Sequence, residues 1–311
     1  RIGSHRELKK ACEQYWSGKI ALSDLHAAGE SIRKDNWILQ KDAGIDLIPS
    51  NDFSYYDQVL DMSLTVGAIP ERYHEVILQK GGNELDLYFA MARGYQQNGL
   101  DITAMEMTKW FDTNYHYIVP EFTRNQEFKL FSTKVIKEFS EAKELGITTK
   151  PVLIGPVSYL LLGKEKEDGF ERIDLIKNLL PVYLEILKKL DALHVEFVQF
   201  DEPFLAMDLN EKEQKAFSYV YGEIKKAFPV IKIILSNYFD CFGENLETVL
   251  SLPVHTLHLD LVRCASQLDD ILDSGKLKSN VNLSLGVVDG RNIWKNDFKH
   301  SLSLIKKAAD K

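Results

Sequence analysis

The sequence predicts an α/β protein built as a (β/α)8 TIM-type barrel, with extra helices before the first strand. From Ile45 onward, short apolar runs alternate with long amphipathic segments. Most of these runs lack the in-out alternation of a half-buried strand, as expected for strands covered on both faces. Seven strand-then-helix units in one chain favour a parallel sheet closed into a barrel. An open doubly wound sheet is the alternative.

The expected strands follow one another along most of the chain. They are Ile45–Pro49, Ala104–Phe111, Pro151–Ile154, Phe197–Phe200, Ile231–Leu235, Thr256–Leu261 and Leu283–Val288. Seven strands are one fewer than a closed barrel needs, so the last strand is either unrecognised or absent from this chain. Because the sequence opens on Arg1 rather than Met, we expect a fragment. Residues 1–44 are expected to form a helical segment packed on a barrel of residues 45–311.

Three helices have recognisable ends or interruptions. A helix is expected over Lys134–Leu145, and another begins after Asn210, which stands three residues before Glu213 as a capping pair does. The long helical pattern of Asp174–His194 contains Pro181, which predicts a kink or a break there.

Composition and charge exclude several classes of protein. The chain has 311 residues, 45% of them hydrophobic, and a net charge of -8, which argues against general nucleic-acid binding. No apolar run is long enough for a membrane helix, and no signal peptide is visible. The cysteines Cys12, Cys241 and Cys264 suggest neither a zinc pair nor a disulfide framework, so a reducing cytoplasm is expected.

Polar side chains gather where the predicted strands end. In a barrel these strand ends meet at one face, where chemistry takes place, so together they indicate a site. The polar strand ends are Asn51-Asp52, Asp112-Thr113-Asn114, Asp201-Glu202, Asn237 and Asp240, Asp260, and Asp289-Gly290-Arg291.

The N-terminal segment has the pattern of an anion site. Ser4 and Glu7 stand three apart, as in a capping box at a helix start. Arg6 and Lys9 then share a face close to the positive end of the helix dipole, where they suit a carboxylate ligand. The ordinary alternative is an exposed helix whose basic residues meet only water.

The block Glu106–Glu121 is unusually rich in large aromatic residues for a strand end and loop. Turn chemistry asks for small residues, not for Trp110, Tyr115 and Tyr117. Such a block suits either a planar or anionic ligand, or a half-buried loop packed by its own side chains.

Two further patterns concern catalysis and metals. Asp201 and Glu202 are adjacent carboxylates at a predicted barrel mouth, where they could act as acid and base or merely cap the loop. His255 and His258 lie three apart on a predicted strand and therefore point to opposite faces, so no metal site is expected. No dinucleotide or ATP motif is present.

Four segments together resemble a known family. They are Arg1–Ala11 (RIGSHRELKKA), Glu106–Glu121 (EMTKWFDTNYHYIVPE), Phe200–Pro203 (FDEP) and Gly286–Trp294 (GVVDGRNIW). In this order they look like the N-terminal half of the cobalamin-independent methionine synthases, which transfer a methyl group from 5-methyltetrahydropteroyltriglutamate to homocysteine without cobalamin.

The resemblance implies a division of labour between two barrels. Zinc and homocysteine belong to the C-terminal barrel, which this chain lacks, so the chain alone is expected to be inactive. The N-terminal barrel helps to bind the glutamate tail of the folate. The tail-binding residues of the family fall on Arg6, Glu7, Leu8 and Lys9, and on Lys109 in the aromatic block.

The resemblance also leaves other roles open. Asp201 and Glu202 look like the relic of a site that functions in the other barrel. The chain could instead be a bracing domain without a ligand. A third hypothesis is an independent hydrolase that pairs Glu202 with Glu121 or Asp260.

Overall fold

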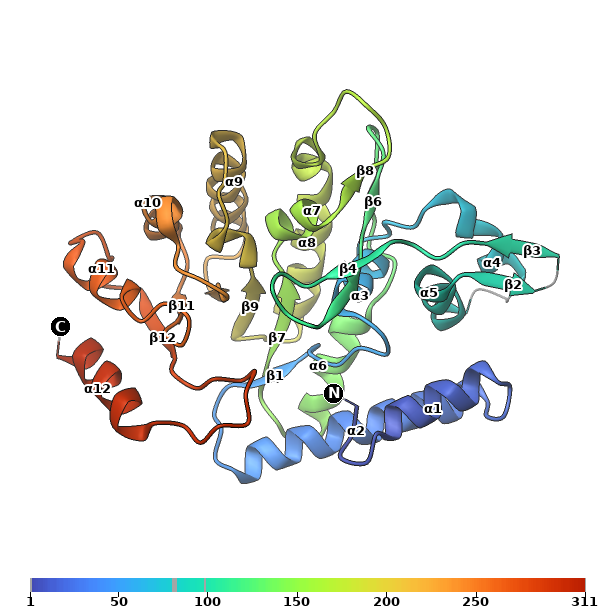
Figure 1. Cartoon of the computed structure of the whole chain (residues 1–311), viewed down its shortest axis with the longest axis horizontal. Helices are drawn as coiled ribbons and strands as arrows, with labels where there is room; N and C mark the ends of the chain where they lie inside the picture. The colour runs from blue at the N-terminus through green and yellow to red at the C-terminus, as the bar shows by residue number, and fades with distance from the viewer. Residues whose placement is uncertain (1, 80–82, 98, 311) are drawn as a thin grey trace.

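A single parallel sheet of six strands is the main feature of the computed structural model, which describes residues 2–79, 83–97 and 99–310. The strand order is β1-β7-β9-β10-β11-β12, and the sheet curls into part of a barrel (Figure 1). These strands span Ile48–Ser50, Thr149–Ile154, Phe197–Asp201, Lys232–Ser236, Thr256–Asp260 and Asn282–Gly286. The predicted barrel-type α/β fold is confirmed.

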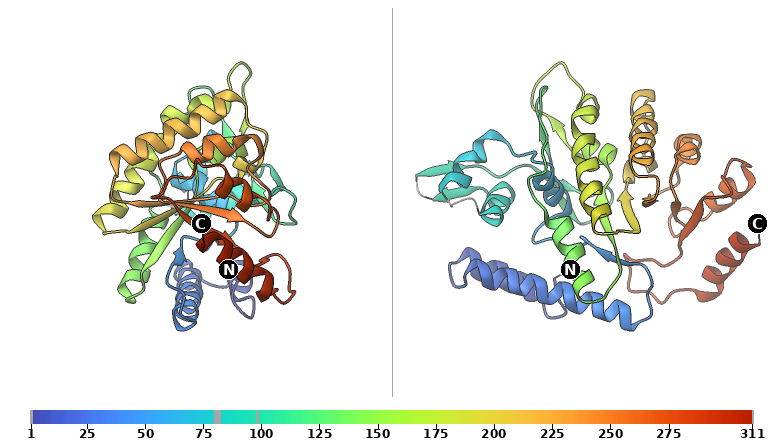
Figure 2. Two further views of the ribbon diagram at one scale, coloured as in Figure 1. Left: turned by 90° about the vertical axis from the view of Figure 1, so that its left-hand side faces the viewer. Right: turned by 180° about the vertical axis from the view of Figure 1, so that it is seen from behind.

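Helices cover the outer face of the sheet (Figure 2). They are α6 (Lys134–Glu144), α7 (Pro156–Leu162), α8 (Ile176–Ala192), α9 (Glu211–Ala227), α10 (Leu246–Ser251), α11 (Gln267–Asp273) and α12 (Phe298–Ala309). Short 3-10 turns occupy Arg172–Leu175, Pro203–Ala206 and Gly243–Asn245. The predicted capping pair is confirmed, because Asn210 Oδ1 accepts from the amide of Glu213 at 3.0 Å. Helix α8 runs on through Pro181, so of the predicted kink or break the break does not occur.

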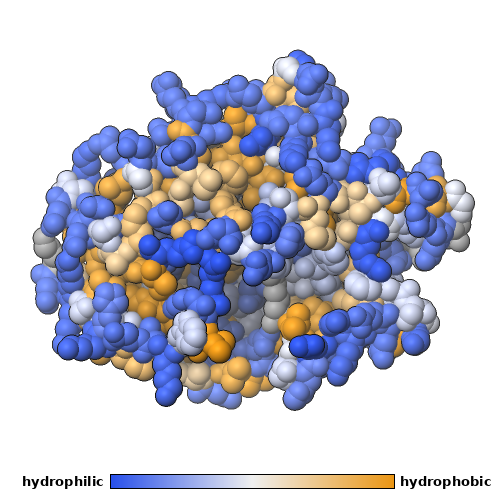
Figure 3. Space-filling view, in the orientation of Figure 1, coloured by the Kyte–Doolittle hydropathy of each residue, from blue (hydrophilic) through white to orange (hydrophobic). Residues whose placement is uncertain are grey.

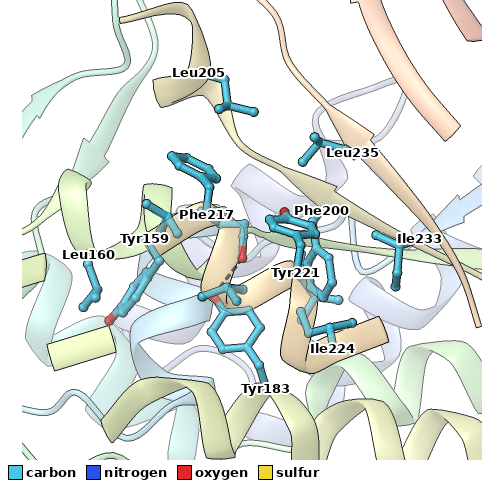
Figure 4. Close-up of a cluster of buried hydrophobic side chains, with 14 of the residues drawn as sticks. Tyr159, Leu160, Tyr183, Phe200, Leu205, Phe217, Tyr221, Ile224, Ile233 and Leu235 are labelled. Atoms are coloured by element: carbon cyan, nitrogen blue, oxygen red, sulfur yellow. Dashed lines mark hydrogen bonds between the residues drawn. The ribbon is translucent and has the colours of Figure 1, made fainter. Parts of the chain in front are cut away.

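The main hydrophobic core lies between the sheet and this helix layer. Phe200 of β9 is fully buried and packs between Tyr183 of α8 and Tyr221 of α9, with ring centroids 5.9 and 6.2 Å away (Figure 4). Large aromatic side chains on both neighbours fix how the helices sit on the strand.

A long insertion between β1 and β7 builds a second region. It contains α3 (Gln58–Thr65), a 3-10 turn (Glu71–Tyr73), α4 (His74–Gln79) and α5 (Glu84–Arg93). Short strands pair as β2 (Tyr95–Gln97) with β3 (Leu100–Ile102), β4 (Met107–Lys109) with β5 (His116–Ile118), and β6 (Glu121–Phe122) with β8 (Lys164–Glu165).

The prediction of a barrel strand over Ala104–Phe111 is wrong. Its central residues, Met107–Lys109, form β4, which pairs antiparallel with β5 outside the main sheet. Met107 is 46% exposed and Lys109 is exposed. A strand of a parallel sheet is covered on both faces, and these side chains are not.

Two helices precede the sheet and lie along the lower edge of the molecule in Figure 1: α1 (Glu7–Trp16) and α2 (Leu22–Asp42). Leu8 of α1 and Leu25 of α2 share a hydrophobic core with Leu60 and Tyr88 of the insertion. The N-terminal helices are therefore packed against the insertion through apolar contacts. Of the helices described, none has the length and apolarity that crossing a bilayer requires.

Two of the three cysteines are paired, contrary to the sequence-based expectation. Cys241, after β10, forms a disulfide with Cys264, after β11, with the Cα atoms 5.4 Å apart. Cys12 is free and buried. The partners are 23 positions apart, and such a pairing leaves no local motif in the sequence. The cysteine pattern therefore no longer supports the expected reducing compartment.

The β12 edge of the sheet carries exposed apolar side chains. Apolar atoms gather over β12 and α12 in Figure 3. Ile293, Trp294 and Phe298 are 97%, 77% and 73% exposed. Exposed apolar patches of this kind mark sites of interaction.

Candidate functional site

The start of α1 is built differently from the predicted capping box. Arg6, not Ser4, is the residue before the helix, and its backbone is left-handed with φ 62°. Glu7 turns its carboxylate back to the amide of His5 at 3.0 Å. Hydrogen bonds from its own amide and from that of His5 lower the pKa of Glu7. The prediction of a capping box between Ser4 and Glu7 is therefore wrong, because the Glu7 carboxylate accepts a hydrogen bond from the amide of His5.

Of the four predicted tail-binding residues at this helix start, two present cationic groups to solvent. Arg6 and Lys9 are both exposed, and Lys9 lies 3.8 Å from Glu13 on the next turn. Leu8 is only 4% exposed, and its amide donates to the carbonyl of Ile2 at 3.1 Å. A ligand at this helix start would therefore meet side-chain cations, and it would not meet the side chain of Leu8.

The fifth predicted residue, Lys109, ends β4 of the β4–β5 hairpin. It lies opposite His116 in the antiparallel register, and both residues are exposed. Arg6 and Lys9 lie at the start of α1, so the three predicted cations come from two separate elements of the fold.

The aromatic residues around Lys109 are mostly buried. Trp110 and Tyr117 are 5% and 8% exposed and meet edge to face, with their ring centroids 5.6 Å apart. The Tyr117 hydroxyl donates to the carbonyl of Leu162 at 3.0 Å. These rings fix the hairpin on the barrel.

Asp57, which no sequence pattern singled out as functional, anchors the same hairpin from the start of α3. The hydroxyl of Tyr115 donates to Asp57 Oδ1 at 3.0 Å, and the amide of Ile118 donates to Oδ2 at 3.0 Å. Burial raises the pKa of Asp57 to about 6, although these hydrogen bonds and one from Leu60 oppose the rise. Asp57 is the residue before α3, and an aspartate at such a position is typical of a helix N-cap. The sequence near Asp57 gives no sign of its contacts with the hairpin.

The tip of the hairpin is held from across the barrel mouth. Asp112 accepts hydrogen bonds from Arg263, which follows β11, and from Arg291 Nη1 at 3.3 Å, which follows β12. Phe111 packs on Phe239, with the ring centroids 5.0 Å apart. Asp112 and Arg291 belong to the predicted polar strand ends, whereas Arg263 does not. The structure therefore brings two of these strand ends together through one carboxylate.

Asp201, the last residue of β9, and Glu202, which follows it, have different hydrogen-bond partners and do not form a pair. Asp201 contacts Gln199 Nε2 at 2.7 Å and the hydroxyl of Tyr238 at 3.2 Å. Burial raises the pKa of Asp201, and these hydrogen bonds oppose the rise. An acid-base pair is therefore not built here.

Glu202 lies in the helix layer instead of the barrel mouth. It is fully buried, accepts from the amide of Ser158 at 2.8 Å and accepts from the hydroxyl of Tyr221 at 3.1 Å. Burial raises the pKa of Glu202 to about 7. Glu121 is held by Arg72 at 2.7 Å, and Asp260 caps backbone amides, among them that of Phe239 at 3.0 Å. The hydrolase hypothesis therefore has no support in the geometry.

Within the described part of the chain, one cluster combines three potential metal ligands: Asp240, Cys241 and Cys264. The two sulfur atoms are already joined to each other as a disulfide. His258 Nδ1 lies 2.9 Å from Ser284 Oγ, and His255 Nδ1 lies 2.8 Å from Thr256 Oγ1. In this state the cysteines are not thiolate ligands.

Comparison with known sequences decides the family. A sequence profile described as "Cobalamin-independent synthase, N-terminal domain" matches residues 1–311. The chain belongs to this family. The sequence-based resemblance to cobalamin-independent methionine synthases is thereby confirmed, and the description itself excludes cobalamin. Three curated relatives carry the name 5-methyltetrahydropteroyltriglutamate–homocysteine methyltransferase: those of Flavobacterium johnsoniae, Cytophaga hutchinsonii and Saccharomyces cerevisiae, which are 72%, 60% and 48% identical to this chain.

The matches cover nearly all of this chain but only part of each relative. They span 100%, 99% and 100% of this chain, against 40%, 40% and 41% of the three methyltransferases. The chain therefore spans about two fifths of the length of these curated relatives.

Solved structures agree on the fold of this family member. A putative vitamin-B12-independent methionine synthase from Listeria monocytogenes aligns with a TM-score of 0.63 at 13% identity, over 98% of this chain and 81% of that one. A B12-independent methionine synthase from a Shewanella species aligns with a TM-score of 0.56 at 14% identity, over 94% and 79%. At such low identity the likeness shows the fold alone.

Proposed function

We propose that the chain is the N-terminal half of a methyltransferase that moves the methyl group of 5-methyltetrahydropteroyltriglutamate to homocysteine. Its own part is to bind the glutamate tail of the folate and to brace the C-terminal half, which would hold zinc and carry the chemistry. The family match and the names of the relatives support this assignment.

The observation that carries the proposal is the exposure of three cations at the positions that match the family's tail-binding residues. Arg6, Lys9 and Lys109 are exposed on a protein whose net charge is -8. A triglutamate tail presents several carboxylates, and each gains from a fixed cationic partner. Remote negative charges of the protein are screened beyond about 8–10 Å, so local cations decide the affinity.

Lys109 belongs to a hairpin that is anchored at its base and at its tip. This favours a role in binding a ligand over simple exposure to water. The hairpin that carries it is anchored by Asp57 at its base and by Asp112 at its tip. Holding a cation in place reduces the conformational entropy lost when the tail binds. Binding energy from the tail can then orient the methyl group for transfer.

The exposed apolar surface at β12 and α12 supports the second role. Ile293, Trp294 and Phe298 would be covered by further protein, and a second barrel in the same polypeptide meets that need. A bracing domain that leaves the tail to the other half is the competing hypothesis. Both hypotheses expect no turnover by this chain alone.

Methyl transfer by the full-length protein distinguishes the two roles. Lys109→Ala should lower kcat/KM for the triglutamyl substrate by about tenfold, the loss expected for one charge-assisted contact. The same variant should leave the monoglutamyl substrate nearly unaffected, and Lys109→Arg should retain most of the preference. Lys10, an exposed neighbour on α1, gives the control Lys10→Ala. An unchanged triglutamate preference in Lys109→Ala would favour the bracing role.

A further inference from the structure

The Cys241–Cys264 disulfide lies beside the contacts that hold the tip of the β4–β5 hairpin. It joins the loop after β10 to the loop after β11, with the Cα atoms of the two cysteines 5.4 Å apart. Arg263, which precedes Cys264 in the sequence, donates a hydrogen bond to Asp112 at the hairpin tip. The disulfide is therefore one residue away from an anchor of the hairpin.

The other loop of the disulfide supplies a second contact with the hairpin. Phe239, two residues before Cys241, packs on Phe111, with the ring centroids 5.0 Å apart. The same ring faces Trp110, with the centroids 6.5 Å apart. Each cysteine thus lies within two residues of a side chain that holds the hairpin.

The backbone of Phe239 depends on the loop after β11. Its φ is 89°, in a region that residues with a side chain rarely adopt and keep only where their surroundings enforce it. Two hydrogen bonds enforce it here. The amide of Phe239 donates to Asp260 Oδ2 at 3.0 Å, and its carbonyl accepts from Arg263 Nε at 3.1 Å. These partners lie at the end of β11 and in the loop after it, which the disulfide ties to the loop of Phe239.

The disulfide can be opened from the side of Cys241. Cys241 is partly exposed, whereas Cys264 is only 6% exposed. A thiolate of a dithiol reductant forms a mixed disulfide with Cys241, and Cys264 leaves as a thiolate that takes up a proton. The second thiolate of the reductant then displaces Cys241, which is protonated in turn. The protein gains two electrons and two protons, and the reductant ends as a disulfide.

We propose that the Cys241–Cys264 disulfide is a redox latch on the β4–β5 hairpin. While the disulfide is formed, the two loops hold the hairpin tip, and Lys109 keeps a fixed position. Once a dithiol reduces it, the loops separate more easily, the tip loosens and the affinity for the glutamate tail falls. The effect on affinity rests on the proposed function, whereas the loosening of the hairpin does not.

Hydrogen exchange of the full-length protein tests the latch directly. After reduction by dithiothreitol, the backbone amides of residues 107–118 should exchange severalfold faster, because local openings of the hairpin become more frequent. The β2–β3 hairpin, a short antiparallel pair elsewhere in the insertion, is the matched control and should keep its exchange rates. Unchanged exchange in residues 107–118 after complete reduction overturns the proposal, and so does equal acceleration in the two hairpins.

Binding of triglutamyl and monoglutamyl 5-methyltetrahydrofolate separates the latch from the proposed function. Homocysteine is left out, because its thiol would itself attack a disulfide. The oxidised full-length protein should prefer the triglutamyl ligand, and reduction should lower that preference severalfold. An equal preference in both states overturns redox control of binding. Absence of any preference in both states contradicts tail binding instead, and the exchange rates of the hairpin then decide on the latch.

Two variants assign the response to this disulfide. The double variant Cys241→Ser/Cys264→Ser should show fast hairpin exchange and a lowered triglutamyl preference without any reductant. Cys12→Ser, which removes the free and buried cysteine, should respond to dithiothreitol as the wild type does. A double variant that behaves like the oxidised wild type overturns the assignment, and so does a loss of the response in Cys12→Ser.

Discussion

Arg263 and Asp112 lie 151 positions apart in the chain, yet the guanidinium of Arg263 donates a hydrogen bond to the carboxylate of Asp112. Arg291 reaches the same carboxylate at 3.3 Å from the next strand end. The tip of the β4–β5 hairpin is thereby pinned to the loops after β11 and β12. Lys109, three residues before Asp112, takes its position from this contact and from the buried rings beside it.

Removing the Asp112 carboxylate should affect ligand binding more than folding. The side chains of Arg263 and Asp112 are 34% and 51% exposed, and ion pairs exposed to solvent contribute little to the free energy of unfolding. We therefore expect Asp112→Asn to shift the thermal midpoint little but to raise KM for the triglutamyl folate severalfold in the full-length protein. Glu211→Gln, in an exposed pair with Lys215, is the control. A normal KM in Asp112→Asn would show that the hairpin needs no such anchor.

Gly155 and Gly222 should respond oppositely to alanine. A Cβ on Gly155 would collide with the carboxyl group of Glu202, which is itself fully buried, so Gly155→Ala should cost about 1–3 kcal/mol or more. Gly222 lies inside α9 with open space around it, so Gly222→Ala should stabilise the protein by about 0.8–1 kcal/mol. Urea unfolding of both variants measures the difference. Equal effects would contradict the close approach of Gly155 and Glu202.

Glu202 should make stability depend on pH. Burial raises its pKa from 4.5 to about 7, so the folded protein binds this proton more tightly than the unfolded chain. The resulting stabilisation is fully present below about pH 4.5 and is lost as the pH rises through about 7, with a total of about 3 kcal/mol. Glu202→Gln should remove this dependence. Urea unfolding between pH 5 and 8 measures it, and an identical pH profile in the variant would refute the assignment.

The Cys241–Cys264 disulfide should stabilise the loops after β10 and β11. Closing a loop with 23 positions between the partners contributes about 3 kcal/mol in the chain-entropy account. Dithiothreitol should therefore lower the thermal midpoint of the wild type and leave that of Cys241→Ser unchanged. Cys12→Ser, which removes the free cysteine, should keep the response to dithiothreitol. A thermal midpoint of the wild type that stays unchanged under conditions that reduce the Cys241–Cys264 disulfide would contradict this contribution.

The sequence predicted most of the barrel because buried parallel strands are continuous apolar runs. Pro151–Ile154 is such a run and lies in β7, whereas Phe197–Phe200 and Thr256–Leu261, where β9 and β11 lie, are rich in apolar residues but include Gln199, His258 and Asp260. Ala104–Phe111 is also apolar enough to resemble a strand, but its exposed residues Met107 and Lys109 place it in a hairpin. Local pattern cannot tell which sheet a short strand joins.

The candidate site was predicted less completely, because contacts between distant residues decide it. The pattern of Ser4 and Glu7 fits a capping box, but the left-handed backbone of Arg6 redirects Glu7 to His5. Asp201 and Glu202 are adjacent in the sequence, which suggested a pair. In the structure Asp201 contacts Gln199, whereas Glu202 contacts Ser158 in the helix layer. The contacts of Asp57 with Tyr115 and Ile118 span about 60 positions and leave no trace in the local sequence.

The most direct test of the account is the preference of the full-length protein for triglutamyl over monoglutamyl substrate in Arg6→Ala, Lys109→Ala and the double variant. If both cations bind the same tail, each single variant should lose about tenfold of the preference in kcat/KM, and the double variant should lose most of it. Lys10→Ala should keep the preference intact. A double variant that still prefers the triglutamyl substrate as strongly as the wild type would contradict tail binding by this half of the protein.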